Sequence, residues 1–217
     1  MSSGMFTGCE VILFLGPPGS GKGTQASRVG SALDIPAIST GEMLRRECNS
    51  GSALGKAVQD ILDAGQLVSD DLINQVVASR LAQGDCRTGC ILDGYPRTVA
   101  QARYLGALLN KLNMGGPVAF HFEISLEEVV GRLENRKRAD DQPATIRERL
   151  RVYNENAVEL IRYYRTRDYY RIAANRTPEE VCDELLSVLG RRWSTAAVSA
   201  QRNVSAQPSF TRIPALS

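Results

Sequence analysis

A short apolar run followed at once by a glycine-rich loop constrains the fold of this 217-residue chain more than any other feature. Residues 11–15, VILFL, contain no polar side chain, which is typical of a strand buried on both faces of a parallel sheet. The loop 16–25, GPPGSGKGTQ, follows directly, and a helix is predicted from about 23 to 33. A strand, a tight loop and a helix in this order are typical of an α/β fold.

The loop 16–25 has the residues of a phosphate-binding site. Its glycines allow tight bends in which successive N–H groups face an anion, and the following helix favours negative charge at its first turn. Lys22 adds a positive charge, but Gly23 follows it where the common pattern Gly-x4-Gly-Lys-Ser/Thr has a hydroxyl, which here comes at Thr24. A glycine-rich turn without a ligand is the alternative. The strand, the spacing, the lysine and the helix together favour a phosphate site.

Four further apolar runs predict the rest of the sheet. They lie at 37–39, 90–92, 118–122 and 170–173, with helical stretches between them. Five short strands that alternate with helices predict a doubly wound α/β sheet. The helical segments 40–84 and 125–168 carry no strand, and we expect them to stand out from the sheet as mobile flaps. Ser69 and Ser125, each followed by acidic residues, mark two helix starts.

Charge, cysteine content and hydropathy limit the classes of protein to which this chain can belong. The net charge of +2 is too small to indicate a nucleic-acid or membrane surface. The five cysteines include no Cys-x2-Cys pair and the one histidine is His121, so we expect free thiols and no zinc site. No apolar run approaches the roughly 20 residues of a membrane span, and the first residues lack a signal-peptide pattern. These features predict a cytoplasmic protein by default.

The end of the chain has a different composition. Ser, Ala, Gln, Asn and Arg dominate from about 191, and Pro208 and Pro214 follow with little periodicity. We predict an N-terminal extension at 1–9, one domain at 10–193 and a disordered tail at 194–217.

Three further motifs accompany the loop. They are STGEMLR at 39–45, LDGYPRTVAQ at 92–101 and RLENRKRADD at 132–141, which continues to Arg149. Together with GPPGSGKGTQ, these motifs resemble the adenylate kinase family of nucleoside monophosphate kinases, over about residues 10–190 and in the order and spacing of that family. In that family the loop reads Gly-Lys-Gly-Thr, so Gly23 is a family trait.

The resemblance implies a fold and a reaction. The fold is like that of the P-loop nucleoside triphosphate hydrolases, with a five-stranded parallel sheet and helices on both faces. The reaction is ATP + AMP ⇌ 2 ADP with Mg²⁺ bound as MgATP. The resemblance also implies an AMP-binding flap at about 39–70 and a short lid at about 132–142 over the ATP phosphates. The expected partners are the nucleotides ATP, AMP and ADP, and the expected state is a monomer.

Phosphoryl transfer between two nucleotides needs alignment, neutralised charge and exclusion of water rather than a dedicated nucleophile. By resemblance, the catalytic cations are Lys22, Arg97, Arg136, Arg138 and Arg149. The implied ATP contacts are Gly16, Gly19, Ser20, Gly21, Lys22, Gly23, Thr24, Arg132 and Arg176. The implied AMP contacts are Thr40, Arg45, Gln66, Val68, Gly94, Arg97, Gln101, Arg138 and Arg149.

Three aspartates are candidates for supporting roles. Asp93 ends the apolar run 90–92, and ligands of parallel sheets bind at the carboxyl ends of the strands. A carboxylate there can hold Mg²⁺ through water, and a turn cap is the alternative. Asp140 and Asp141 are expected either to aim the neighbouring arginines or to cap the helix ahead of Thr145.

The acceptor nucleotide is the main point left open by the motifs. A UMP/CMP kinase is the alternative, for which the resemblance predicts alanine in place of Thr40 and asparagine in place of Thr98 and Gln101. The glutamine amide offers donors and an acceptor to an adenine edge, so this chain favours AMP. An inactive nucleotide-binding regulatory protein is a further alternative, against which the complete set of charged residues argues.

The short lid departs from the family pattern. Only Lys137 separates Arg136 from Arg138, where relatives have several residues. Lys137 or a shifted helix end is therefore an alternative for the position assigned to Arg136. His121 is expected to be structural, because the mechanism requires no such base.

Overall fold

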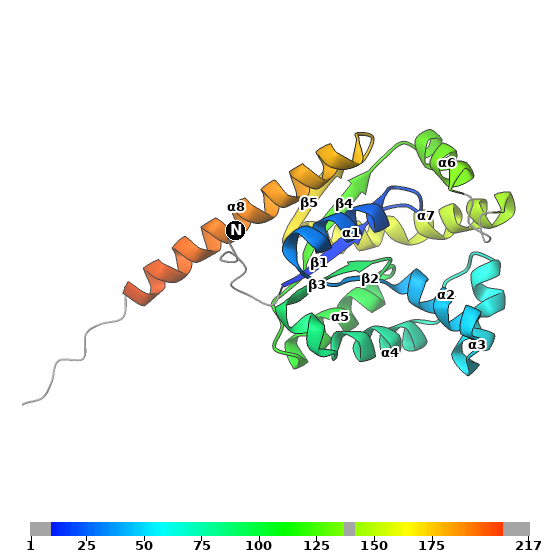
Figure 1. The fold of residues 1–217 in the computed structure, drawn as a ribbon, viewed down its shortest axis with the longest axis horizontal. Coiled ribbons are helices and arrows are strands. Elements are labelled where there is room, and N and C mark those ends of the chain that lie inside the picture. Colours follow the sequence, from blue (N-terminus) through cyan, green and yellow to red (C-terminus); the bar gives the residue numbers. More distant parts are fainter. Residues whose placement is uncertain (1–9, 137–141, 206–217) are drawn as a thin grey trace, which may run out of the picture.

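The computed structural model describes residues 10–136 and 142–205. Five parallel strands form one sheet in the order β2-β3-β1-β4-β5 (Figure 1). The strands are β1 Glu10–Leu15, β2 Ala37–Ser39, β3 Gly89–Asp93, β4 Val118–Glu123 and β5 Tyr169–Ala173. The predicted fold class is confirmed, and each strand agrees with its predicted run to within one residue at either end.

The strand register brings several strand ends to one edge of the sheet. Asp93 pairs with Phe14 of β1 and with Ser39 of β2, and Leu15 pairs with His121 of β4. The loop that follows β1 therefore begins beside the carboxyl ends of β2 and β3, where ligands of α/β sheets bind.

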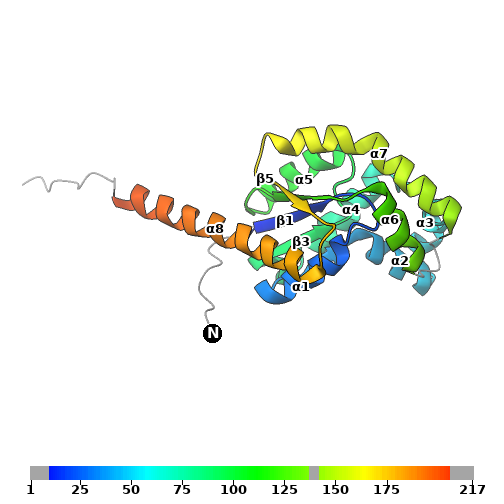
Figure 2. The same cartoon turned by 90° about the horizontal axis from the view of Figure 1, so that it is seen from above.

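Helices cover both faces of the sheet. They are α1 Lys22–Leu33, α2 Thr40–Ser50, α3 Ala53–Asp63, α4 Asp70–Leu81, the 3₁₀ helix η1 Gly84–Thr88, α5 Val99–Lys111, α6 Leu126–Asn135, α7 Pro143–Arg165 and α8 Pro178–Ser205. Helices α1 and α8 lie on one face, and α4, α5 and α7 lie on the other (Figure 2). Alternate residues of β1 supply the two cores, with Val11 and Leu13 on the α4–α5 side and Ile12 and Phe14 on the α1–α8 side.

Local capping explains where several helices begin. A hydroxyl oxygen accepts a bond from the backbone N–H three residues later at Ser39, Ser52, Ser69, Thr98 and Ser125. The helix starts predicted at Ser69 and Ser125 are therefore confirmed. Helix α7 begins at Pro143, ahead of the predicted Thr145, because proline fits the first turn of a helix.

Helix α8 extends further than the sequence predicts. A disordered tail was expected from 194, but α8 continues through Ser205, and its C-terminal part projects from the body of the domain (Figure 1). No Gly or Pro interrupts the chain between Arg191 and Pro208, and Ala, Gln and Arg propagate a helix that has already begun. The prediction is therefore wrong over 194–205, whereas 206–217 lie outside the described residues, as does the extension at 1–9.

The part of α8 that packs on the domain ends at an anchor formed with β1. Trp193 is 8% exposed, and its Nε1 donates to Glu10 Oε2 at 2.6 Å. Arg192 pairs with both Glu10 and Asp168. Among the helices in 10–136 and 142–205, none combines the length and the hydropathy that a bilayer span requires.

Candidate active site

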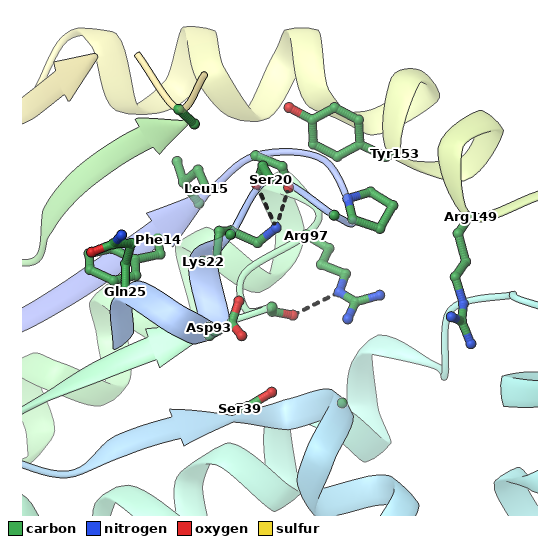
Figure 3. Close-up of a pocket in the computed structure, with 18 of the residues that line it drawn as sticks. Phe14, Leu15, Ser20, Lys22, Gln25, Ser39, Asp93, Arg97, Arg149 and Tyr153 are labelled. Atoms are coloured by element: carbon green, nitrogen blue, oxygen red, sulfur yellow. Dashed lines mark hydrogen bonds between the residues drawn. The ribbon is translucent and has the colours of Figure 1, made fainter. Parts of the chain in front are cut away.

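A cavity of about 610 Å³ lies at the carboxyl edge of the sheet, within the size range of small-molecule sites. Figure 3 shows the loop after β1, the end of β3 and the wall formed by α7 around it. The predicted residues that line it are Gly16, Gly19, Ser20, Gly21, Lys22, Gly23, Thr24, Arg45, Asp93, Gly94, Arg97, Arg132, Arg136, Arg149 and Arg176. The fold thus brings together residues from four separate motifs.

The glycine loop has a conformation that other residues would not tolerate. Gly19 has φ 84°, and a Cβ there would lie 2.9 Å from Leu133 Cγ. Gly21 has φ 92° and is the N-cap of α1, where no side chain caps the first turn. An anion at this turn would meet N–H groups that no side chain caps.

The side chain of Lys22 is hydrogen-bonded to the first half of its own loop. Its Nζ donates to Gly16 O at 2.9 Å and to Ser20 Oγ at 3.3 Å (Figure 3), and to Pro17 O at 2.7 Å. Burial is the main cause that lowers the pKa of Lys22 to about 8; Asp93 opposes this, and the charges of Arg97 and Arg136 add to the lowering. The amine therefore lies in a site where positive charge is in excess.

Arg97 lies in a second group of cations at the same cavity. Its Nε donates to Gly94 O at 2.8 Å, which directs the guanidinium into the cavity (Figure 3). Burial lowers the pKa of Arg97, Asp93 opposes this, and the charges of Arg149 and Arg45 lower it further. Because a guanidinium stays charged, an anion is what relieves this repulsion.

Gly41 and Gly94 leave room for these arginines. A Cβ on Gly41 would lie 3.2 Å from Arg45 Nη1, and a Cβ on Gly94 would lie 3.1 Å from Arg97 Nη2. Gly94 also has φ 79°, a conformation that favours glycine. In each of the motifs STGEMLR and LDGYPRT, the glycine therefore leaves the space that the guanidinium of the motif's arginine occupies.

Asp93 is the carboxylate of the cavity nearest the loop. Its Oδ2 lies 3.4 Å from the position that a Cβ on Gly23 would take. Within 10–136 and 142–205 there is no cluster of three or more His, Cys, Asp or Glu side chains that could hold a metal ion. A single carboxylate is sufficient for Mg²⁺ that keeps its water and binds phosphates, so Asp93 fits this ion.

Another part of the cavity lining combines apolar residues with two arginines. Arg132 Nη2 donates to Ala174 O at 2.9 Å, and Gln25 Nε2 donates to Pro178 O at 2.8 Å. Ala174, Pro178 and Val181 line this end together with Arg132 and Arg176. An apolar slot between guanidinium groups suits a flat aromatic base.

Four predicted AMP contacts do not line the cavity. Thr40 and Gln101 are each 2% exposed, and Val68 is 7% exposed in the core. Thr40 Oγ1 donates to Gly94 O at 3.0 Å, so it lies directly behind the wall. The side chain of Gln66 turns away to Glu148, and Gly65 and Leu67 line the cavity instead. Because Val68 packs in the core, its neighbours Gly65 and Leu67 line the cavity in its place.

Arg138, Asp140 and Asp141, three predicted members of the site, lie outside the described residues, as does Lys137.

One face of α7 supplies lining that the sequence analysis missed. Tyr153, Asn156 and Leu160 line the cavity after Arg149. Their spacing of three and four residues is the period of a helix face, which is the signal that could have found them. Tyr153 also lies 3.5 Å from His121 Nε2, and His121 Nδ1 lies 2.9 Å from Tyr169 OH.

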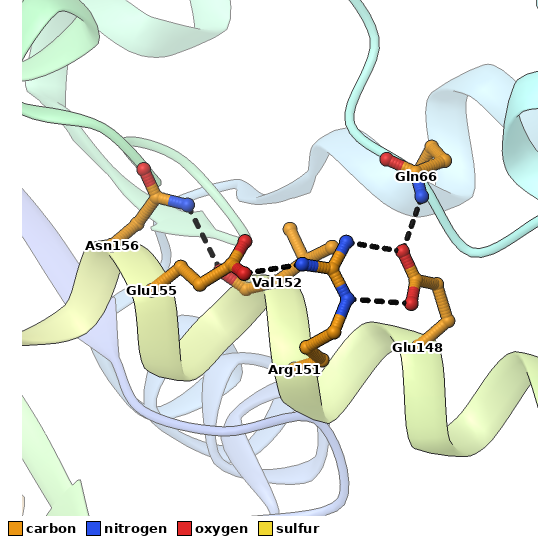
Figure 4. A network of polar contacts seen from close by, with 6 residues as sticks. All are labelled: Gln66, Glu148, Arg151, Val152, Glu155 and Asn156. Atoms are coloured by element: carbon orange, nitrogen blue, oxygen red, sulfur yellow. Dashed lines mark hydrogen bonds and ion pairs between the residues drawn. The ribbon is translucent and has the colours of Figure 1, made fainter.

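The segment 63–66 rests on the beginning of α7, beside Arg149. Thr145 Oγ1 donates to Asp63 O at 3.0 Å, and a Cβ on Gly65 would lie 2.9 Å from Thr145 O. Gln66 donates to Glu148, whose carboxylate also accepts bonds of 2.6 and 2.8 Å from Arg151 (Figure 4). The hydrogen bonds from Arg151 lower the pKa of Glu148, which keeps this network charged.

Comparison with known proteins agrees with this geometry. A family model described as adenylate kinase matches residues 14–169. The chain is 39% identical over 212 residues to an adenylate kinase of Thermosipho melanesiensis, an alignment that covers 83% of this chain and 99% of the relative. The chain belongs to the adenylate kinase family. It is therefore a phosphotransferase of the nucleoside monophosphate kinase type.

Other relatives in the family cover similar shares of the chain. An adenylate kinase of Stenotrophomonas maltophilia is 45% identical over 160 residues, or 72% of this chain and 86% of the relative. A protein of Nostoc sp. named adenylate kinase 1 is 43% identical over 180 residues, or 82% of this chain and 98% of the relative. The resemblance predicted from four motifs is thus confirmed at the level of the family.

Proposed function

We propose that this chain transfers the terminal phosphoryl group of MgATP to AMP and forms two molecules of ADP in the cavity at the sheet edge. The observation that carries the proposal is that two groups of cations share this one cavity. The charges of Arg97 and Arg136 lower the pKa of Lys22, so the two groups are close enough to act on a common polyanion.

The glycine loop forms the donor half of the site. Its backbone N–H groups and the first turn of α1 bind the triphosphate, and Lys22 neutralises the outer phosphates. We assign the ATP base to the apolar slot between Arg132 and Arg176, where Pro178 forms a wall. Contacts made largely by backbone and apolar groups fix the position of a base with little demand on its polar edge.

The acceptor half lies at the ends of β2 and β3. Arg45 and Arg97 bind the AMP phosphate, since both line the cavity and Arg97 is oriented by Gly94. Thr40 and Gln101 lie directly behind this wall, and we assign the AMP base to their side. The 65–68 loop of the flap borders the same region through Gly65 and Leu67.

Transfer requires an AMP phosphate oxygen in line with the terminal phosphorus of ATP. As the bond to that phosphorus forms and the bond to the leaving ADP oxygen breaks, charge on the equatorial oxygens is matched by Lys22, Arg136 and Arg149. Arg138 belongs to the same group by its motif, and Asp140 and Asp141 would orient it. No side-chain nucleophile is needed.

Asp93 is the residue that would hold Mg²⁺, through water, beside the glycine loop. When bound, the ion supplies charge neutralisation of the ATP phosphates.

We further propose that residues 39–70 are the AMP-binding flap and 132–142 the lid, and that the protein acts as a monomer in the cytoplasm. Closure of both segments would exclude water, which otherwise competes with AMP for the phosphoryl group. Light scattering after size exclusion would test the monomer, and fractionation of cells would test the compartment.

A coupled assay of ADP formation tests the proposed function. Purified protein is expected to turn over ATP with AMP, and to use UMP and CMP at a kcat/KM lower by about a hundredfold or more, because a wrong base leaves polar groups unpaired. A preference for UMP or CMP would establish the pyrimidine alternative. Nucleotide binding without turnover would identify a regulatory protein instead.

A further inference from the structure

Three polar side chains behind the acceptor half of the cavity are bonded to one another. Gln101 Nε2 donates to Asp70 Oδ1 at 2.6 Å, and Thr98 Oγ1 donates to Asp70 Oδ2 at 3.0 Å. At the other end of the amide, the backbone N–H of Arg97 donates to Gln101 Oε1 at 2.7 Å. Asp70 belongs to none of the four motifs of the site and lies 31 residues before Gln101 in the chain.

These contacts permit only one orientation of the Gln101 amide. The carboxylate of Asp70 accepts and cannot donate, whereas the N–H of Arg97 donates and cannot accept. A reversed amide would set its oxygen against the carboxylate and its NH₂ against the N–H, so both bonds would be lost. The bond to Asp70 is the charge-assisted one, and it is the shorter of the two.

The fixed amide keeps one N–H of Nε2 and one lone pair of Oε1 for a ligand. The edge of adenine offers an amino donor at C6 beside an acceptor at N1. Hypoxanthine offers the reverse, an oxygen acceptor at C6 beside a donor at N1. A glutamine amide that could turn over would pair with either base, whereas a fixed amide matches one of them.

We propose that Asp70 is a positioning residue that makes the acceptor site select a 6-aminopurine over a 6-oxopurine by fixing the amide of Gln101. This inference rests on the proposed function, in which the AMP base binds on the side of Gln101. Gln101 is 2% exposed and does not line the cavity in the ligand-free chain, so a base reaches it only after the wall opens locally. The orientation of the amide is thus set before the base arrives.

The fold holds Asp70 in place from two sides. It is the first residue of α4, whose N-cap Ser69 accepts a bond from Leu72 N. Thr98 caps α5 by accepting from Gln101 N at 3.1 Å while donating to Asp70. The next residue, Asp71, is exposed in the same first turn of α4 and provides a matched control for the charge.

The experiment compares Asp70→Asn and Asp70→Ser with Asp71→Asn in the full chain. The kcat/KM of each protein is measured with AMP and with inosine monophosphate, and the KM for ATP is measured alongside. The asparagine offers both a donor and an acceptor to the amide, and the serine is too short to reach it. We expect both Asp70 variants to raise the KM for AMP about tenfold and to lower the AMP-to-IMP ratio of kcat/KM at least about tenfold. Asp71→Asn should leave the ratio within about twofold of the parent, and no variant should change the KM for ATP.

The outcomes separate this inference from the proposed function. A parent protein that does not turn over AMP would remove the proposed function itself. If the parent prefers AMP and the Asp70 variants have the same AMP-to-IMP ratio of kcat/KM as Asp71→Asn, Asp70 does not select the base. A loss of activity with AMP and IMP in equal proportion would assign Asp70 to stability alone.

A measurement on the unaltered protein covers the case in which the Asp70 variants fail to fold. Hydrogen exchange of the side-chain amide of Gln101, followed by NMR, should be slower by at least about a hundredfold than that of the exposed Gln83. Addition of AMP should shift the resonances of the Gln101 amide, and IMP at equal concentration should shift them less. Equal exchange at Gln101 and Gln83, or equal shifts with both nucleotides, would overturn the inference.

Discussion

Single residues at the cavity place like charges near one another. Lys22 donates three hydrogen bonds to residues 16, 17 and 20 of its own loop, and Arg97 donates one to Gly94. Burial and the neighbouring guanidinium groups lower the pKa of both side chains. A bound polyanion would favour the charged form of Lys22, so the chemistry of the site can be measured through protons and through single substitutions.

The first prediction concerns proton uptake at Lys22. The pKa of this amine is about 8 without ligand, and a bound triphosphate favours the charged form and raises it. Below pH 8 the amine is largely charged already, so binding takes up little proton. Above pH 8 binding must protonate it, and the affinity for ATP should fall by up to about tenfold per pH unit. Calorimetry at pH 8.5 in two buffers of different ionisation enthalpy should show the uptake, and Lys22→Arg, which stays charged, should abolish it. A pH-independent affinity up to pH 9.5 would contradict the prediction.

The second prediction concerns the anion site at Arg97. Arg97→Lys removes the fork that bonds Gly94 O and that would grip the AMP phosphate. The kcat/KM for AMP should fall by about 100-fold, while the Kd for ATP changes by less than about threefold. The exposed Arg103 of α5 supplies the control, since Arg103→Lys should leave both quantities unchanged. Equal losses for ATP and AMP would place Arg97 outside the acceptor half.

At the scale of elements, the flap and α7 form a joint beside the cavity. Thr145 bonds Asp63 O, Gly65 packs on Thr145, and Gln66 pairs with Glu148 (Figure 4). Arg149 lies one turn after Thr145, so the position of the flap and that of a cavity arginine depend on the same contact. Changes in the joint should therefore act on AMP more than on ATP.

The third prediction tests this joint with two glycines of similar backbone. Gly65 and Gly51 have φ 75° and 67°, but only Gly65 has neighbours within 4 Å of an added Cβ. Gly51→Ala should lower the free energy of unfolding by about 1 kcal/mol, through backbone strain alone. Gly65→Ala should cost about 3 kcal/mol, because the methyl group would press on Thr145 O, and should raise the KM for AMP about tenfold. Denaturant unfolding and steady-state kinetics measure both effects, and equal behaviour of the two variants would show that the flap does not rest on α7.

At the scale of the whole molecule, α8 covers one face of the sheet and is anchored at Arg192 and Trp193, where its packed part ends. Trp193 donates to Glu10 at the start of β1, and Arg192 joins Glu10 to Asp168 next to β5. Beyond Trp193 the helix continues through Ser205, and Figure 1 shows this part away from the domain. The fold should therefore depend on α8 up to Trp193 and little beyond it.

The fourth prediction compares chains that end after Ser194 and after Gly190. The first should keep its activity and its free energy of unfolding to within about 0.5 kcal/mol of the full chain. The second loses the indole packing and the ion pairs of Arg192, and should be less stable by about 3 kcal/mol. Chemical denaturation followed by circular dichroism would measure both. A large loss for the chain ending at Ser194 would show that the projecting part of α8 supports the fold.

Local signals explain how much of the molecule could be read from the sequence. The buried run before Gly16, the caps at Ser69 and Ser125 and the glycine spacing around Lys22 are set by backbone preferences over a few residues. These signals predicted the strands and the starts of α1, α4 and α6. The same reasoning missed the continuation of α8 past Trp193, because polar composition alone does not end a helix that has already begun.

The sequence by itself determined the parallel α/β fold, the glycine-rich loop after β1 and membership of the adenylate kinase family, since each depends on residues adjacent in the chain or on motifs in a known order. Only the tertiary structure decided that Gln101 donates to Asp70, that Gln66 donates to Glu148, and that one side of α7 lines the cavity. The partners in the first two contacts are 31 and 82 residues apart. Such contacts leave no local pattern, because they depend on how the helices pack on the sheet rather than on the conformation of any one segment.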